Sequence, residues 1–153
     1  MAEGKNISPE KIHIREFKLV NGQVDSPFEF LPGNIKSFKY DVDFNMGFNH
    51  EEELIKADFT VRVSTVSIEP SVEAFGTYHF VFIFHVESMG EHVQISNEAV
   101  DLNPYLGNAI ASISYSTSRG ILMSRFQGTV MKDFILPVVD PNLLLQNKQL
   151  QGT

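Results

Sequence analysis

The run from Ile35 to Phe48 constrains the fold of this chain more than any other stretch. From position 38 onward its even-numbered residues are large and apolar, while most of its odd-numbered residues are polar or charged. Alternation with a period of two predicts a β-strand with one buried and one solvated face, as is typical of antiparallel sheets. The apolar face comprises Phe38, Tyr40, Val42, Phe44, Met46 and Phe48, and the polar face comprises Lys39, Asp41, Asp43 and Asn45.

Two further runs predict strands in which the alternation changes phase. In Lys11–Val20 the apolar residues switch parity near Glu16, which predicts a β-bulge or an edge strand. In Ala57–Ile68 the parity changes near Ser64 and Thr65, where a second bulge is expected.

The remaining strand, Thr77–Glu87, is apolar on both faces. One face is almost entirely aromatic, and the other carries His79, Val81, Ile83 and His85. This pattern suits an interior strand that is covered on both sides, or a strand whose outer face meets another subunit. The sequence leaves both interpretations open.

A long helix is predicted to begin at Asn103. Asn is a favoured N-cap, and Pro104 at the first helical position lacks only an N–H that would have no helical partner. An apolar crossover, 120–136, follows, stops at Pro137 and leads to a second helix that starts at Asp140. Small residues in the long helix predict tight helix contact between subunits. These oligomer-interface candidates are Gly107, Ala111, Ser114 and Ser118.

Strands that are followed by helices predict the α+β class. The expected order is a four-stranded antiparallel sheet, a long helix, the apolar crossover and a short second helix. The length of 153 residues suits a single domain, 1–153, and we expect its ends, 1–10 and 147–153, to be disordered tails.

Composition and motifs argue against several classes of function. A net charge of −7 disfavours binding to nucleic acid or to an anionic membrane. The chain has no cysteine, no apolar run of bilayer length and no apolar segment after its polar N-terminus. We therefore expect a cytoplasmic protein without a signal peptide or direct membrane insertion.

Motifs for chemistry are also missing from the sequence. There is no nucleotide-binding or hydrolase motif, and His79 and His85 are too far apart along one strand to chelate one ion. We expect no enzyme activity, no metal site and no cofactor.

The crossover is rich in large apolar residues. One interpretation is a loop that packs onto its own helices. The other is an adaptable apolar surface for nonpolar segments of other proteins, for which Met and Phe are well suited. The candidate contact residues are Leu122, Met123, Phe126, Met131, Phe134 and Ile135, with Met46 and Phe48 at the end of the sheet.

This order of parts resembles the SecB family of protein-export chaperones. The resemblance is carried by Ser118-Arg119-Gly120 near the end of the long helix and by Leu136-Pro137-Val138 before the second helix. Phe28-Glu29, after the first strand, resembles a phenylalanine–glutamate pair of the family, and Leu143, Leu144 and Leu145 stand in its apolar second helix. In layout the resemblance covers nearly the whole chain.

The resemblance implies an ATP-independent molecular chaperone. Such a protein binds unfolded polypeptides, including preproteins, in apolar grooves and keeps them competent for export. It would be a homotetramer, a dimer of dimers, with the long helices between two sheets. Its partner would be the SecA translocation motor, with Glu29 and Glu87 as candidate contacts, or a dedicated client such as an antitoxin.

Two functions from other classes remain as alternatives. One is a small α+β ligand-binding protein or enzyme with an internal apolar pocket. The other is a purely structural assembly subunit.

Overall fold

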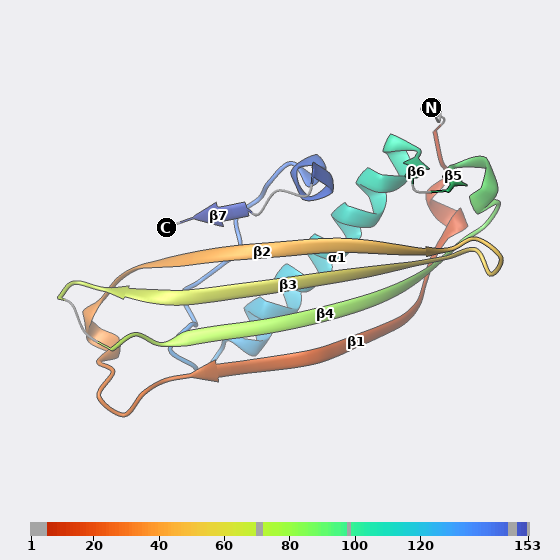
Figure 1. Cartoon of the computed structure of the whole chain (residues 1–153). Coiled ribbons are helices and arrows are strands. Elements are labelled where there is room, and N and C mark those ends of the chain that lie inside the picture. The colour runs from red at the N-terminus through yellow and green to blue at the C-terminus, as the bar shows by residue number, and fades with distance from the viewer. Residues whose placement is uncertain (1–5, 70–71, 98, 147–149, 153) are drawn as a thin grey trace.

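The computed structural model describes residues 6–69, 72–97, 99–146 and 150–152. Its main feature is an antiparallel sheet in the order β1-β4-β3-β2-β7, with one long helix, α1, across one face (Figure 1). The expected order of four strands and then a long helix is confirmed. The elements are β1 (Ile12–Asp25), β2 (Ile35–Asn49), β3 (Leu54–Ser67), β4 (Phe75–Val86), α1 (Pro104–Arg125) and β7 (Leu150–Gly152).

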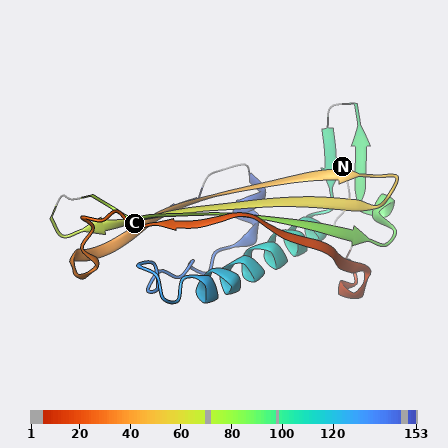
Figure 2. The same ribbon diagram turned by 90° about the horizontal axis from the view of Figure 1, so that it is seen from below.

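Smaller elements lie at the ends of the sheet. A short hairpin of β5 (Val93–Ser96) and β6 (Ala99–Leu102) stands at one end, and α1 occupies one side of the sheet only (Figure 2). In the part of the chain that the structure describes, no helix covers the other side of β1 to β4, so these residues form two layers. Short 3-10 helices form at Pro9–Lys11, Pro32–Asn34 and Met89–Glu91.

The register of β1 explains its change of phase. β1 pairs with β4, and the register shifts between Ile14 and Glu16 and once more further along the strand. Ile14 lies opposite Phe84 and Phe17 lies opposite Phe82, so both fall on the helix side despite their different parity. β1 is also the end strand of the sheet. The predicted bulge and the predicted edge position are both confirmed.

The bulge expected near Ser64 and Thr65 lies in the neighbouring strand instead. β2 and β3 pair in continuous register from Ser37 onward, and the shift falls between Ile35 and Ser37. Thr65 is buried, and its hydroxyl accepts a hydrogen bond from the Ala74 N–H (3.0 Å), which offsets the cost of removing that hydroxyl from water. In the sequence Thr65 is a polar residue at a position of the buried face. It therefore looks like a break in the alternation, and the sequence predicts the bulge at the wrong place.

The core lies between the sheet and α1. Asn103 caps the helix as predicted, since its side-chain oxygen accepts a hydrogen bond from the Tyr105 N–H (3.0 Å). Aromatic rings fill the layer: the centroid of Phe59 lies 6.4 Å from that of Phe80 and 5.5 Å from that of Tyr115 on α1. On β4 the helix side is buried and the opposite side is half-buried, so in this chain β4 is one-sided, like β2.

The C-terminal segment returns to the sheet. The second helix is a single 3-10 helix, η4 (Pro141–Gln146), and the Asp140 carboxylate accepts a hydrogen bond from the Asn142 N–H (3.0 Å). Residues 150–152, which were expected in a disordered tail, form β7 and pair with Tyr40–Val42 on β2. Of the tail expected at 1–10, Pro9 and Glu10 lie in the 3-10 helix Pro9–Lys11, which differs from the expected disorder. Residues 1–5, 147–149 and 153 lie outside the described residues.

Candidate functional site

The predicted crossover, 120–136, is helical up to Arg125, because α1 extends further than the sequence suggested. The remaining crossover, 126–136, is folded against the helix side of the sheet. After α1 ends, the chain forms turns in which the Thr129 N–H donates to the Phe126 carbonyl (3.0 Å) and the Phe134 N–H donates to the Met131 carbonyl (2.9 Å). The Phe126 ring packs edge-on against Tyr78, with 5.4 Å between the ring centroids. The crossover therefore continues the inner layer beyond the end of α1.

The second half of the crossover contacts both the sheet and the helix. The Phe134 ring centroid lies 5.7 Å from those of Phe38 and Tyr40 on β2. The Tyr115 hydroxyl of α1 donates to the Pro137 carbonyl (2.6 Å). Burial raises the pKa of Tyr115 to about 12, so this hydroxyl stays protonated and remains a donor near neutral pH.

These contacts divide the eight predicted contact residues into three groups. The exposed pair, Met123 (44% exposed) and Ile135 (57%), presents apolar surface to solvent. The other six are covered to different degrees by their own chain, and four of the six candidates within 120–136 are buried, so most of this segment packs onto its own fold. Leu122, Phe126, Met131 and Phe134 are buried, and Met46 and Phe48 are half-buried.

The small residues of α1 face the interior of the chain. Gly107, Ala111, Ser114 and Ser118 are all buried within this single chain. A Cβ at Gly107 would lie 3.0 Å from Leu102 Cδ2, so the absence of a side chain permits this close approach. These four small residues bring α1 close to the rest of its own chain. This differs from the contact between subunits that the sequence suggested.

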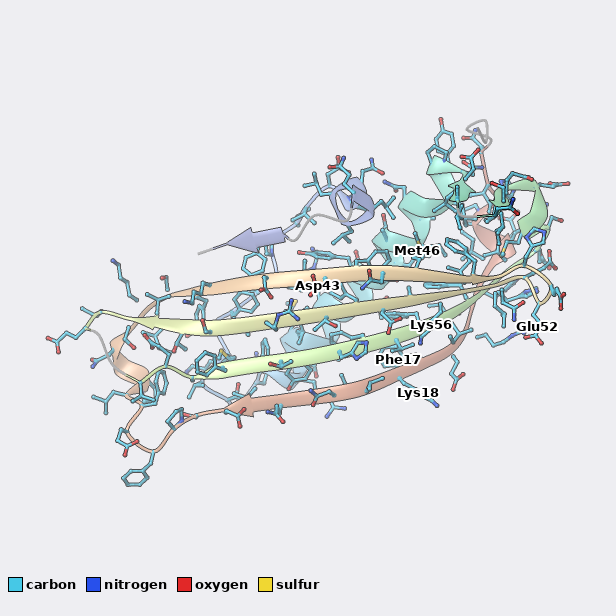
Figure 3. All side chains as sticks on the ribbon, in the orientation of Figure 1. Phe17, Lys18, Asp43, Met46, Glu52 and Lys56 are labelled. Atoms are coloured by element: carbon cyan, nitrogen blue, oxygen red, sulfur yellow. The ribbon has the colours of Figure 1, made fainter. Side chains whose placement is uncertain are left out.

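β1 exposes apolar residues that the sequence analysis did not select. Ile14 (50% exposed) and Phe17 (39%) lie on the helix side, but α1 packs against β3 and leaves β1 largely uncovered. Figure 3 shows Phe17 and Lys18 on this outer strand. The change of parity near Glu16 was the available signal, because a bulge there puts both apolar residues on one face of an edge strand.

The face opposite α1 carries charged residues that are paired locally, beside the apolar Val81 and Ile83 of β4. Arg62 forms ion pairs with Asp41 (2.7 Å) and with Asp43, and its hydrogen bond with Asp43 raises the pKa of Arg62. His79 and Asp58 lie 2.9 Å apart on neighbouring strands. Such pairing is typical of a solvated sheet face.

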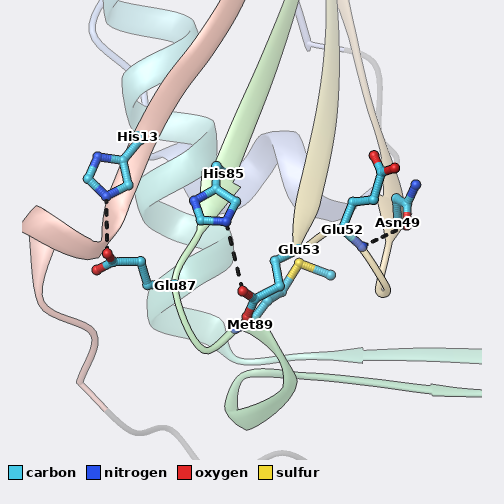
Figure 4. A network of polar contacts seen from close by, with 7 residues as sticks. All are labelled: His13, Asn49, Glu52, Glu53, His85, Glu87 and Met89. Carbon is cyan, nitrogen blue, oxygen red and sulfur yellow. Dashed lines mark hydrogen bonds and ion pairs between the residues drawn. The ribbon is translucent and has the colours of Figure 1, made fainter.

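Two histidines lie side by side near one end of this face (Figure 4). The ring centroids of His13 and His85 are 6.1 Å apart. Nε2 of His13 lies 3.8 Å from Oε1 of Glu87, and Nε2 of His85 lies 3.8 Å from Oε1 of Glu53. Within the described residues, no group of three or more His, Asp or Glu side chains is placed to hold a metal ion. Glu29 follows β1 and lies at the opposite end of the sheet from Glu87, so these two partner candidates do not share one patch.

None of the helices in the described part of the chain has the length and apolarity that crossing a bilayer requires.

Comparisons with known proteins bear on the fold. No model of a known protein family matches the sequence, and no curated protein matches it either. Among solved structures, the chain is similar to the Mycobacterium tuberculosis SecB-like chaperone Rv1957 in complex with a ChAD peptide from the Rv1956 HigA1 antitoxin. The identity is 12%, the TM-score is 0.55, and the match covers 85% of this chain and 91% of that chain. The chain therefore has the SecB-like α+β fold.

Proposed function

We propose that this protein is an ATP-independent chaperone that binds unfolded polypeptides through exposed apolar side chains. The observation that carries the proposal is the exposure of large apolar residues on β1 and on the crossover of a SecB-like fold. An unfolded client buries its own apolar segments against such a surface, with little preference for sequence.

The contact surface that we propose has two parts. Ile14 and Phe17 form the part on β1, and Met123, in the last turn of α1, and Ile135, on the crossover, form the other part. Half-buried Met46 and Phe48 extend it along β2. Leu122 on α1 and Phe126, Met131 and Phe134 on the crossover are buried, so they would join this surface only in a conformation in which the crossover leaves the sheet.

We further propose a homotetramer that serves a dedicated polypeptide client. The separation of Glu29 and Glu87 argues against one acidic docking patch for the SecA motor. The structural neighbour Rv1957 was solved with an antitoxin peptide, which favours a polypeptide of that kind as the client. Release then needs a partner, because the sequence carries no nucleotide-binding motif.

Size exclusion with light scattering tests this function. We expect a tetramer that forms a stable complex with a permanently unfolded polypeptide and not with the folded form of that polypeptide. A monomer that ignores the unfolded chain would contradict the proposal and favour a small-ligand protein. An oligomer that is indifferent to unfolded chains would favour a structural subunit.

Paired variants test where the client binds. The double substitution Met123→Ser and Ile135→Ser should weaken binding of the unfolded polypeptide by about tenfold, because it removes apolar area that the complex buries. Ile95→Ser is the matched control, since Ile95 is 50% exposed but lies on the short hairpin. Equal losses in the two proteins would contradict the proposed placement.

A further inference from the structure

The outer edge of β2 is only partly occupied. β2 runs from Ile35 to Asn49, and β7 pairs with Tyr40–Val42 alone. Among the described residues, no other strand pairs with this side of β2. Within the described ranges, the stretch Asp43–Asn49 therefore has no strand partner on this side, and η4, the 3-10 helix before β7, is the other C-terminal element that contacts β2.

This edge has the regular geometry that an added strand needs. The register shift within β2 falls between Ile35 and Ser37, and the pairing with β3 is continuous from Ser37 to Asn49. An unpaired regular edge is a template for main-chain hydrogen bonding with an extended peptide. β1 differs, because two register shifts divide its pairing into short runs.

The side chains beside the open stretch set the chemistry of its ligand. Met46 and Phe48 lie on the helix side, and Asp43 and Asn45 lie on the side opposite α1; Asp43 and Met46 are labelled in Figure 3. Successive residues of a strand point to opposite faces. A segment with alternating apolar and polar residues therefore fits this edge.

We propose that the outer edge of β2 binds an extended segment of a client polypeptide by strand addition, and that the client displaces β7. This inference rests on the proposed chaperone function and assigns a binding edge to it. A segment longer than the stretch Asp43–Asn49 reaches Tyr40–Val42, where β7 sits. Client and β7 then compete for the same backbone groups.

β7 should compete only weakly with a client for the edge of β2. It spans three residues, and only residues 147–149 separate it from η4. A short connection gives an intramolecular strand an effective concentration of roughly millimolar order, while a strand this short forms few hydrogen bonds. The apparent affinity for the client is reduced by the fraction of molecules in which β7 covers the edge.

Removal of β7 tests the competition. A variant that ends at Gln146 should bind a permanently unfolded polypeptide about tenfold more tightly than the intact chain. The full-length variant Gln151→Pro is the companion, because proline has no N–H to donate and fits poorly within a strand. It should tighten binding in the same direction even if the truncated chain folds poorly. Unchanged affinity in both variants would overturn the competition.

Hydrogen exchange identifies the edge. With the unfolded polypeptide bound to the truncated variant, amides in Tyr40–Asn49 should exchange more slowly. A free peptide of residues 147–153 should reverse this protection. Protection on β1 alone, with client still bound, would overturn the β2 assignment and leave the chaperone function standing. Failure to bind any unfolded polypeptide would overturn both proposals.

A mass measurement tests whether a second copy of the chain, rather than a client, occupies the edge. If the truncated variant forms a larger oligomer in which the Tyr40–Asn49 amides are protected without a client, the edge binds a second copy. That outcome would overturn the assignment to a client.

Discussion

The outer edges of β1 and β2 differ in the features that limit pairing of their backbone with another strand. β1 is interrupted by two register shifts and carries charged residues such as Lys18, features that discourage pairing with another strand. β2 is regular along most of its length and is covered in its middle by β7. β1 therefore offers mainly apolar side chains to a partner, while β2 offers mainly backbone. An unfolded client can use both, and the following predictions separate the two.

The largest expected difference is in how much an aromatic side chain on the helix side contributes to the free energy of unfolding at each edge. Phe134 is buried against Phe38 and Tyr40 of β2, whereas Phe17 of β1 is 39% exposed. Phe134→Ala should lower the free energy of unfolding by about 3–5 kcal/mol, because it leaves a cavity. Phe17→Ala should cost about 1 kcal/mol, since part of its ring is already in water. Urea denaturation measures both. Equal losses would show that β1 is buried in solution, for example against a second copy.

A second difference lies in two glycines, one on each edge. A Cβ at Gly22 of β1 would lie 2.8 Å and 2.9 Å from ring carbons of the buried Tyr78, while a Cβ at Gly47 of β2 would meet nothing within 4 Å. Gly22→Ala should therefore destabilise the protein by about 1–3 kcal/mol through overpacking. Gly47→Ala should change stability by less than about 0.5 kcal/mol. Denaturation midpoints decide this, and a larger effect at Gly47 would contradict the account of the two edges.

Client binding should depend on the apolar side chains of β1. The double substitution Ile14→Ser and Phe17→Ser should reduce affinity for an unfolded polypeptide about tenfold while the fold is kept. Ile95→Ser serves as the control because Ile95 and Ile14 are equally exposed, at 50%. Fluorescence anisotropy with a labelled unfolded polypeptide measures the effect. If the control loses as much affinity, binding does not depend on β1.

Much of this comparison could be predicted from the sequence. The alternation in β2 and the change of parity near Glu16 identified a regular strand and an irregular edge, and Asn103 marked the start of α1. The order of elements and short motifs such as Leu136-Pro137-Val138 indicated the SecB-like fold. These features are local, so they can be read from neighbouring residues.

Other features depend on contacts between distant segments and could not be predicted. Phe126 and Phe134 lie in a loop without periodicity, and their burial depends on Tyr78 and on the inner face of β2. β7 is too short to show alternation, and it exists as a strand because β2 offers an edge. The placement of Gly107 and Ser118 was ambiguous, since small residues suit both intersubunit contact and close packing within one chain.

The smallest effect is expected away from both edges, near the connection between β3 and β4. The Glu73 carboxylate accepts hydrogen bonds from the Ser67 hydroxyl (2.7 Å), the Ser67 N–H (2.9 Å) and the Thr65 hydroxyl (2.9 Å). The hydrogen bonds from Ser67 are the main reason that the pKa of Glu73 lies below its ordinary value of 4.5. A group whose pKa is lowered on folding contributes stability above its unfolded pKa, and this contribution is lost as the pH falls through the folded pKa.

Glu73→Gln removes this titration, so the free energy of unfolding should fall less steeply below pH 4.5 in the variant than in the unaltered protein. Glu29→Gln is a charge-matched control, because Glu29 is exposed in the connection between β1 and β2. Urea denaturation at a series of pH values measures the slopes, and identical slopes in the two variants would contradict the role of the hydrogen bonds. Client affinity should be unchanged in both, because neither position lies on β1 or on the open stretch of β2. A loss of affinity in Glu73→Gln alone would show that the connection between β3 and β4 influences the edges.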